Sequence, residues 1–279
     1  MIASGLIVFT ADLPWSEIGA RAFMTALVVL LVALIVGKLG PMIGGLMAGL
    51  PMGFAPGFYF LIKTQSTPAL HAAGSHALLA LCATQAFLLS YMLTCRFSAP
   101  MASLCYSIGI WLLAIYALNM LSLGLPATFA LFTMTTFATR KLGKGLRQND
   151  VVTDRSESYV LLIARACFGG ILVAVVTVCA PKLGGELSGI LLAFPIGFAL
   201  ICLTTHEQYG PATLIDFAYS ALRGATSLAM FCLGFTAALS AVSGYRALAI
   251  GLIAALVSTG VLMLIAASEK KSLSLRRSA

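Results

Sequence analysis

The chain has 279 residues, of which 60% are hydrophobic and 9% are charged, and its formal net charge is +8. An ordinary soluble domain is about 45–50% apolar and about 25% charged. This composition excludes a soluble enzyme, a disordered protein and a secreted disulfide scaffold, and it predicts an integral membrane protein. The basic excess then reflects cytoplasmic loops, so we predict no nucleic-acid partner.

Nine apolar segments are long enough, or nearly so, to cross a bilayer, which takes about 20 helical residues. The stretch before residue 18 has no basic n-region and carries Asp12, so it reads as an interfacial segment and not as a cleavable signal peptide. The segment 121–139 is the weakest span, because Gly124 and Pro126 interrupt its start. The sequence therefore predicts an all-α, polytopic transmembrane bundle with spans at 18–37, 40–62, 69–94, 99–118, 121–139, 158–180, 185–205, 212–240 and 245–267.

A basic polar stretch, 140–157, separates a first repeat (1–139, about five spans) from a second (158–279, about four spans with a basic tail). If this stretch is cytoplasmic, eleven Lys and Arg residues lie inside, and three, Lys63, Lys182 and Arg246, lie outside. The positive-inside rule then predicts a multi-pass protein of the inner (plasma) membrane, with its N-terminus outside and its C-terminus in the cytoplasm.

The two halves resemble each other at an offset of 144 residues. Between 20–55 and 164–199, 13 of 36 positions are identical without a gap, including the Lys-Leu-Gly triplets at 38–40 and 182–184. An odd number of spans in the first half makes the second half enter the membrane from the opposite side. We therefore predict inverted repeats, a plan common among secondary transporters. If 121–139 does not span, the repeats become parallel.

Small residues recur every four positions in the second and seventh spans. These stripes favour close helix packing, and in one arrangement the two spans pack on each other at the repeat interface. The alternative to a functional role for the stripes is a purely structural packing motif. Prolines interrupt both helices at equivalent positions, so each helix is expected to bend or break. We predict that Pro51, Gly53, Pro195 and Gly197 form a hinge or a backbone binding site, the alternative being an ordinary proline kink.

Charged residues inside a membrane need a partner. Arg21 and Arg165 are repeat equivalents and read either as anion-attracting gates or as interfacial side chains that snorkel to the surface. Asp216 and Arg223 lie seven residues apart on one helix face, so Arg223 lines a cavity in one interpretation and joins a structural ion pair in the other.

Other polar residues give weaker signals. His71, His76 and His206 read as interfacial, with proton coupling as the alternative, and Gln85 either lines a pathway or bonds across helices. The cysteines are scattered in apolar stretches, and no catalytic motif, metal-ligand spacing or P-loop is present. We therefore predict no enzyme activity, no cofactor and no metal.

The segment 188–201, SGILLAFPIGFALI, resembles the GlpM-like family of small bacterial inner-membrane proteins, which are about the length of one repeat. The two-repeat plan also looks like that of drug/metabolite-type transporters. The resemblance implies an inner-membrane permease or an accessory to envelope metabolism, and it assigns no residue a role.

These features predict a secondary transporter (permease) for a small anionic or zwitterionic solute, working by alternating access between the two repeats. The alternatives are a non-transporting accessory or scaffold subunit of an envelope-biosynthesis or transport complex, and a channel. The expected partners are the solute and membrane lipid, with a homodimer or a complex partner left open.

Overall fold

The computed structural model describes residues 40–51, 53–147 and 182–278, with side chains to Ser268, and the single positions Gly19, Phe23 and Leu27. These ranges contain helices and no strand, as the sequence predicted. The predicted spans 18–37 and 158–180 fall almost wholly outside the described residues. The helices of the first half are α3 (Pro41–Ala48), α4 (Phe54–Thr64), α5 (Thr67–Thr94), α6 (Pro100–Asn119) and α7 (Leu125–Lys144).

The second half contains α9 (Gly184–Leu192), α10 (Ile196–Ala238) and α11 (Gly244–Ser278). Helix α10 is kinked at Gly210, which has φ 82 and is followed by Pro211. We call 196–209 the first arm of α10 and 211–238 its second arm. The kink lies between two segments that the sequence predicted as separate spans.

Proline and glycine set several helix starts. Helices α3, α5, α6 and α7 each have proline in the first two positions, where its missing amide costs nothing. Gly40 immediately precedes α3 and has a φ of 89°, and Gly184 is the first residue of α9 and has a φ of 79°. Glycine adopts this left-handed conformation without strain, which gives the glycine that ends each Lys-Leu-Gly triplet a structural reason.

The core lies between α5 and the second arm of α10. The aromatic side chains of Phe87, Phe217, Phe231 and Phe235 are fully buried there. In the most apolar stretch of α5, 72% of residues are buried, against 22% in α6 and 22% in α11. The outer faces of α6 and α11 are nevertheless apolar, with Leu113 and Leu264 among the exposed side chains. Apolar faces outside and a packed centre fit a bundle whose surroundings are lipid.

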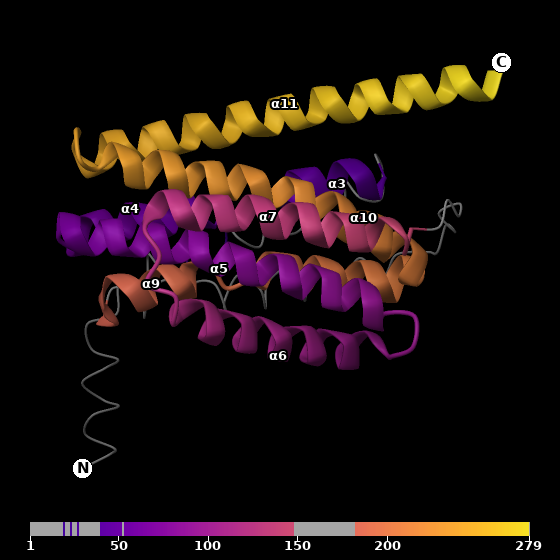
Figure 1. Ribbon diagram of the computed structural model, residues 1–279, viewed down its shortest axis with the longest axis horizontal. Helices are drawn as coiled ribbons and strands as arrows, with labels where there is room; N and C mark the ends of the chain where they lie inside the picture. The colour runs from indigo at the N-terminus through magenta and orange to yellow at the C-terminus, as the bar shows by residue number, and fades with distance from the viewer. Residues whose placement is uncertain are drawn as a thin grey trace, which may run out of the picture.

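Within the described residues, four helical stretches are long and apolar enough to cross a membrane: Thr67–Thr94, Pro100–Asn119, Gly184–Ala238 and Gly244–Ser268. These agree with a membrane protein. Helix α7 is not one of them, because its last turns carry basic residues, but it runs back alongside α5 and α10 (Figure 1). The total of nine spans stays a prediction.

The helices run along one long direction, and their connections gather at its two ends (Figure 1). At one end lie α9, the α6–α7 connection and the α10–α11 connection; at the other lie α3 and the α5–α6 connection. The end of α4 and the starts of α9 and α11 lie at the first of these ends (Figure 1). The three basic residues predicted to be outside are at or next to these helix ends, namely Lys63 in the last turn of α4, Lys182 two residues before α9 and Arg246 in the first turn of α11. We call this end of the bundle the α9 end and the opposite one the α3 end.

Candidate functional site

The first predicted helix break is present. Helix α3 ends at Ala48, α4 begins at Phe54, and the turn between them contains Pro51. Pro51 is buried, and its carbonyl accepts the amide hydrogen of Ala55 at 2.9 Å. The break starts a new helix inside the protein, and the first turn of α4 has no acidic residue to balance its positive end.

The second break lies at the equivalent place in the other half. Helix α9 ends at Leu192 and α10 begins at Ile196, with Pro195 between them as the N-terminal cap of α10. The Pro195 carbonyl accepts the amide hydrogen of Ala199 at 2.8 Å, as Pro51 does in the first break. The first turn of α10 also lacks an acidic residue. Two positive helix ends therefore start within the bundle, one in each half.

The glycines that follow the two prolines face open space. Gly53 and Gly197 are both half-buried, and a Cβ built on either would meet no atom of the described residues within 4 Å. A glycine packed against another helix would show backbone or side-chain atoms there. The main chain at these two glycines is therefore not covered by a packed helix, and its role as a hinge or a backbone binding site stays a prediction.

The small-residue stripes of the two broken helices do pack closely, but chiefly on other helices. Gly45 lies against the backbone of Phe217 and Ala221, and Gly49 lies against Gly224, all on the second arm of α10. These contacts leave no room for a Cβ. The arrangement in which the two predicted spans pack on each other is therefore wrong for most of the stripe.

The stripe of α9 packs in the same way on the first half. Gly185 lies against the backbone of Ala69, and Gly189 against that of Ala73, both on α5. One contact does join the two broken helices directly, where Gly57 of α4 meets the side chain of Leu192. Each half thus places its short helix on the long central helix of the other.

Asp216 has a partner that the sequence did not predict. Its carboxylate lies 2.7 Å from Nε of Arg147, which follows α7. The guanidinium groups of Arg140 and Arg147 lie 4.7 and 4.9 Å from the centre of the Tyr219 ring, and Arg140 donates to the Tyr219 hydroxyl at 3.1 Å. Asp216 therefore belongs to an ion pair and cation–π cluster that ties the end of α7 to α10.

The three predicted site arginines are not brought together by the described contacts. Arg223 is half-buried on the second arm of α10, beside the Gly224 that packs on α3. Arg21 and Arg165 lie outside the described residues, so their roles as gates or interfacial anchors stay predictions.

Gln85 bonds across helices at the centre of the bundle. Its side chain is fully buried on α5, its amide donates to the Leu222 carbonyl at 3.4 Å, and its carbonyl accepts from the Thr139 hydroxyl at 3.5 Å. Nearby, the indole of Trp111 donates to the Thr84 hydroxyl at 3.2 Å. These bonds link α5 to α6, α7 and α10, so the central polar groups stabilise the packing.

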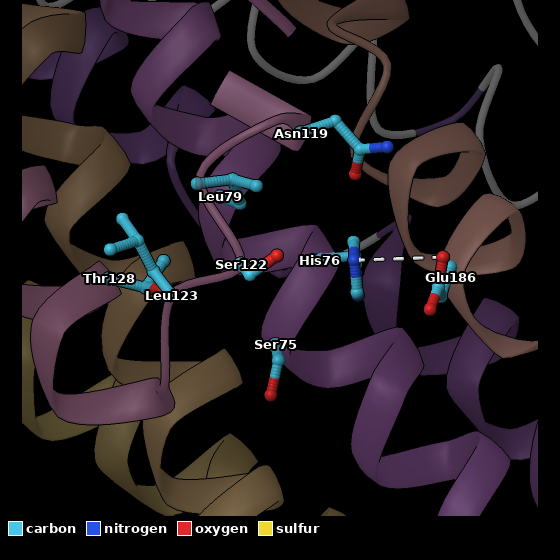
Figure 2. A pocket seen from close by; sticks show the side chains of 8 residues that line it. All are labelled: Ser75, His76, Leu79, Asn119, Ser122, Leu123, Thr128 and Glu186. Carbon is cyan, nitrogen blue, oxygen red and sulfur yellow. Dashed lines mark ion pairs between the residues drawn. The ribbon is translucent and has the colours of Figure 1, made fainter. Parts of the chain in front are cut away.

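A polar pocket that the sequence did not indicate lies at the α9 end (Figure 2). It encloses about 270 Å³ and is lined from four elements: α5, the α6–α7 connection with the end of α6, α7 and α9. His76 and Glu186 face each other across it, with Nε2 and Oε2 4.0 Å apart. Its lining consists of Ser75, His76, Leu79, Asn119, Ser122, Leu123, Thr128 and Glu186.

Sequence reasoning missed this pocket because its two titratable residues are far apart in the chain and neither belongs to a motif. The reciprocal packing offers a signal in retrospect. The contacts of Gly185 and Gly189 place α9 beside the first turns of α5, and that packing brings the long side chain of Glu186 within reach of His76. Among the described residues, no group of three or more His, Cys, Asp or Glu side chains could hold a metal ion.

The Arg147–Asp216 pair gives a prediction for stability. Replacing Asp216 by arginine places a third cation beside Tyr219 and should lower the melting temperature in detergent. The double variant Arg147→Asp with Asp216→Arg restores opposite charges and should recover most of the loss. A partly exposed pair of this kind is worth about 1 kcal/mol or less, so the shift will be small. Fluorescence-detected thermal unfolding measures it, and a double variant no better than the single one would contradict the pairing.

Comparison of the chain with protein-family models, with curated proteins and with solved structures finds no match.

Proposed function

We propose that the protein is a secondary transporter built from two inverted repeats, which moves a small anionic or zwitterionic solute between them. The observation that carries the proposal is the pair of equivalent helix breaks, each with an open glycine and each packed on the opposite half. Discontinuous helices of this kind are the usual binding elements of secondary transporters.

The helix boundaries support a duplication. At the 144-residue offset seen in the sequence, α3 corresponds to α9, α5 corresponds to the second arm of α10, and the start of α6 corresponds to the start of α11. Gly40 and Gly184, which differ by the same offset, share a positive φ. Unrelated apolar helices have no reason to keep one offset over so many boundaries.

The directions of the helices support inversion. The α5–α6 connection and its equivalent, the α10–α11 connection, lie at opposite ends of the bundle (Figure 1). Helices α3 and α9 lie at opposite ends as well. Equivalent elements that run in opposite directions are what an axis in the membrane plane produces.

The glycine contacts support a two-fold relation. Gly45 contacts Phe217, and Gly189 contacts Ala73. At the 144-residue offset, Gly45 corresponds to Gly189 and Phe217 corresponds to Ala73. The two contacts are therefore the same contact made once by each half. In a two-fold interface, if residue i contacts residue j of the other copy, then j contacts i. The broken helices are therefore suited to move in opposite senses, so that one end opens as the other closes.

The breaks also suit the proposed solute. The first amides of a helix have no partner within that helix, and the dipole favours negative charge there. Helices α4 and α10 both start at a break and carry no acidic residue in the first turn. A carboxylate on the solute could accept hydrogen bonds from such amides beside Gly197. The start of α4 offers fewer donors, because Ala55 already donates to Pro51 and Pro56 has no amide hydrogen.

Uptake into proteoliposomes tests the proposal. The probes are labelled alanine, lactate and ethanolamine, a zwitterion, an anion and a cation of similar size. We expect uptake above that of empty liposomes for alanine or lactate. Filling the open positions, with Gly53→Val and Gly197→Val, should reduce it about tenfold or more because a side chain takes the place of the solute.

Two controls show whether a loss of uptake is specific to the breaks. Gly109 on α6 also faces open space but lies far from both breaks along the chain, so Gly109→Val should leave uptake unchanged. Size-exclusion chromatography checks that all variants stay folded. No uptake of any probe, or equal uptake by the break variants and the parent, would contradict the proposal.

A further inference from the structure

The pocket at the α9 end contains an arrangement of hydrogen-bond acceptors that needs a donor. The ring nitrogen Nδ1 of His76 lies 2.9 Å from the carbonyl oxygen of Ala72. A carbonyl can only accept, so Nδ1 carries the hydrogen, and in the neutral ring Nε2 is an acceptor. Nε2 is the atom that faces Glu186.

Two acceptors therefore lie opposite each other. Neutral Nε2 and the Glu186 carboxylate are 4.0 Å apart, too far for a direct hydrogen bond and both without a hydrogen to share. A single nitrogen about 2.9 Å from each atom fits on the open side of this gap. An ammonium group supplies such a nitrogen, with several hydrogens and a positive charge.

The rest of the lining fits the same ligand. Ser75, Asn119 and Ser122 contribute hydroxyl and amide groups, and the described lining holds no Lys or Arg. With His76 neutral, the lining carries one negative charge, from Glu186. The volume of about 270 Å³ admits a solute of a few heavy atoms and is small for a drug-sized one.

The position of Glu186 links the pocket to the helix break. Glu186 lies in the first turn of α9, the short helix that ends before Pro195, whereas His76 lies on the continuous helix α5. A group bound to both residues therefore holds α9 against α5. Its departure removes this tie and leaves the packing of the α9 glycine stripe on α5.

We infer that this pocket binds the ammonium group of a small zwitterionic solute between His76 and Glu186, and that a proton on His76 competes with it. The inference rests on the proposed function and narrows it, since a purely anionic solute would be repelled by Glu186. A protonated ring pairs with Glu186 directly and removes the acceptor that the ammonium group needs. Proton and solute thus exclude each other, which is the requirement for exchange.

Among the described residues that line the pocket, Glu186 is the one titratable neighbour of His76. The α6–α7 connection and α7 contribute Asn119, Ser122 and Thr128, none of which titrates in the physiological range. His71 on the same helix and Lys182 before α9 are not part of the lining. A pH dependence of binding that disappears when His76 is replaced therefore reports on His76.

Calorimetry on the purified full-length protein in detergent tests the inference, with alanine, ethanolamine and lactate as probes. At about pH 8 we expect alanine and ethanolamine to bind and lactate not to bind, and at about pH 5 the binding should weaken about tenfold or more. Glu186→Gln should lower the affinity for both ammonium probes by about tenfold or more, because it removes the charge and keeps the shape. Glu186 is largely exposed, so this change should not disturb folding.

Two histidine variants separate the site from general effects. His76→Gln keeps an acceptor but cannot be protonated, so it should still bind ethanolamine and lose the pH dependence. His71→Gln, on the same helix and exposed, should behave as the parent. Binding that is unchanged in Glu186→Gln, or lactate binding as tight as that of alanine, would overturn the inference.

The same variants distinguish this inference from the proposed transport. Glu186-dependent binding without uptake of any probe would support the site and contradict transport. Uptake that Glu186→Gln leaves unchanged, together with no binding of the ammonium probes, would overturn the site and leave transport standing.

Discussion

Gly49→Ala should abolish the native packing, whereas Gly53→Ala, four residues away, should leave it intact. A Cβ on Gly49 would collide with the main chain of Gly224, which cannot move without shifting the central helix α10. A Cβ on Gly53 meets nothing, and the backbone there is already α-helical, with φ −85 and ψ −34. Overpacking of this kind costs about 1–3 kcal/mol and more where backbone is struck.

The second half offers a matched pair. Gly189→Ala places a Cβ against the backbone of Ala73 and should be as damaging as Gly49→Ala, whereas Gly197→Ala should be tolerated. Yield of monodisperse protein and melting temperature in detergent measure all four variants. Equal stability of the four would show that the broken helices do not pack on the opposite halves as described.

Cysteines placed at Ser98 and Ser243 should react with a membrane-impermeant maleimide from opposite sides of the membrane. Ser98 lies exposed in the α5–α6 connection and Ser243 in the α10–α11 connection, at opposite ends of the bundle (Figure 1). With the predicted orientation, Ser98→Cys is labelled in inside-out vesicles and Ser243→Cys in right-side-out vesicles. The effect should be nearly all or none.

The parent chain, with its own seven cysteines, gives the background for this labelling. Cys82, Cys95, Cys202 and Cys232 are buried, and a polar reagent should not reach them. Labelling of both new cysteines from one side would rule out inverted repeats. Reversed sides would keep the repeats and contradict the predicted orientation.

The sequence predicted local features well because each depends on a few neighbouring residues. Pro51 and Pro195 cannot sit inside a regular helix, and both breaks are found at these residues. Helices α5, α6 and α11 begin within two residues of their predicted starts, where proline or glycine marks them. The kink at Gly210 was missed as such, because the same residues also fit the loop between two spans.

Partners across the fold could not be predicted, because one chain gives no information on which faces meet. A stripe of glycine shows that something packs closely and does not show what; Gly49 meets Gly224, far along the chain. The sequence offered Asp216 as a partner for Arg223 on the same helix, but the structure pairs Asp216 with Arg147. His76 and Glu186 gave no signal separately, and their meeting depends on α9 lying on α5.

The exchange of short helices between the halves has a consequence for synthesis. Helix α3 has 8 residues and is about 12 Å long, too short to cross the roughly 30 Å hydrocarbon layer by itself. Its supporting surface at Gly224 is translated 175 residues after Gly49, which takes about 9 to 35 seconds at about 5–20 residues per second. During that interval α3 has been synthesised, but the part of α10 that packs on its glycines has not. The packing of α3 is therefore completed only when the second half arrives, and a nascent chain arrested between the two halves should be a target for membrane proteases.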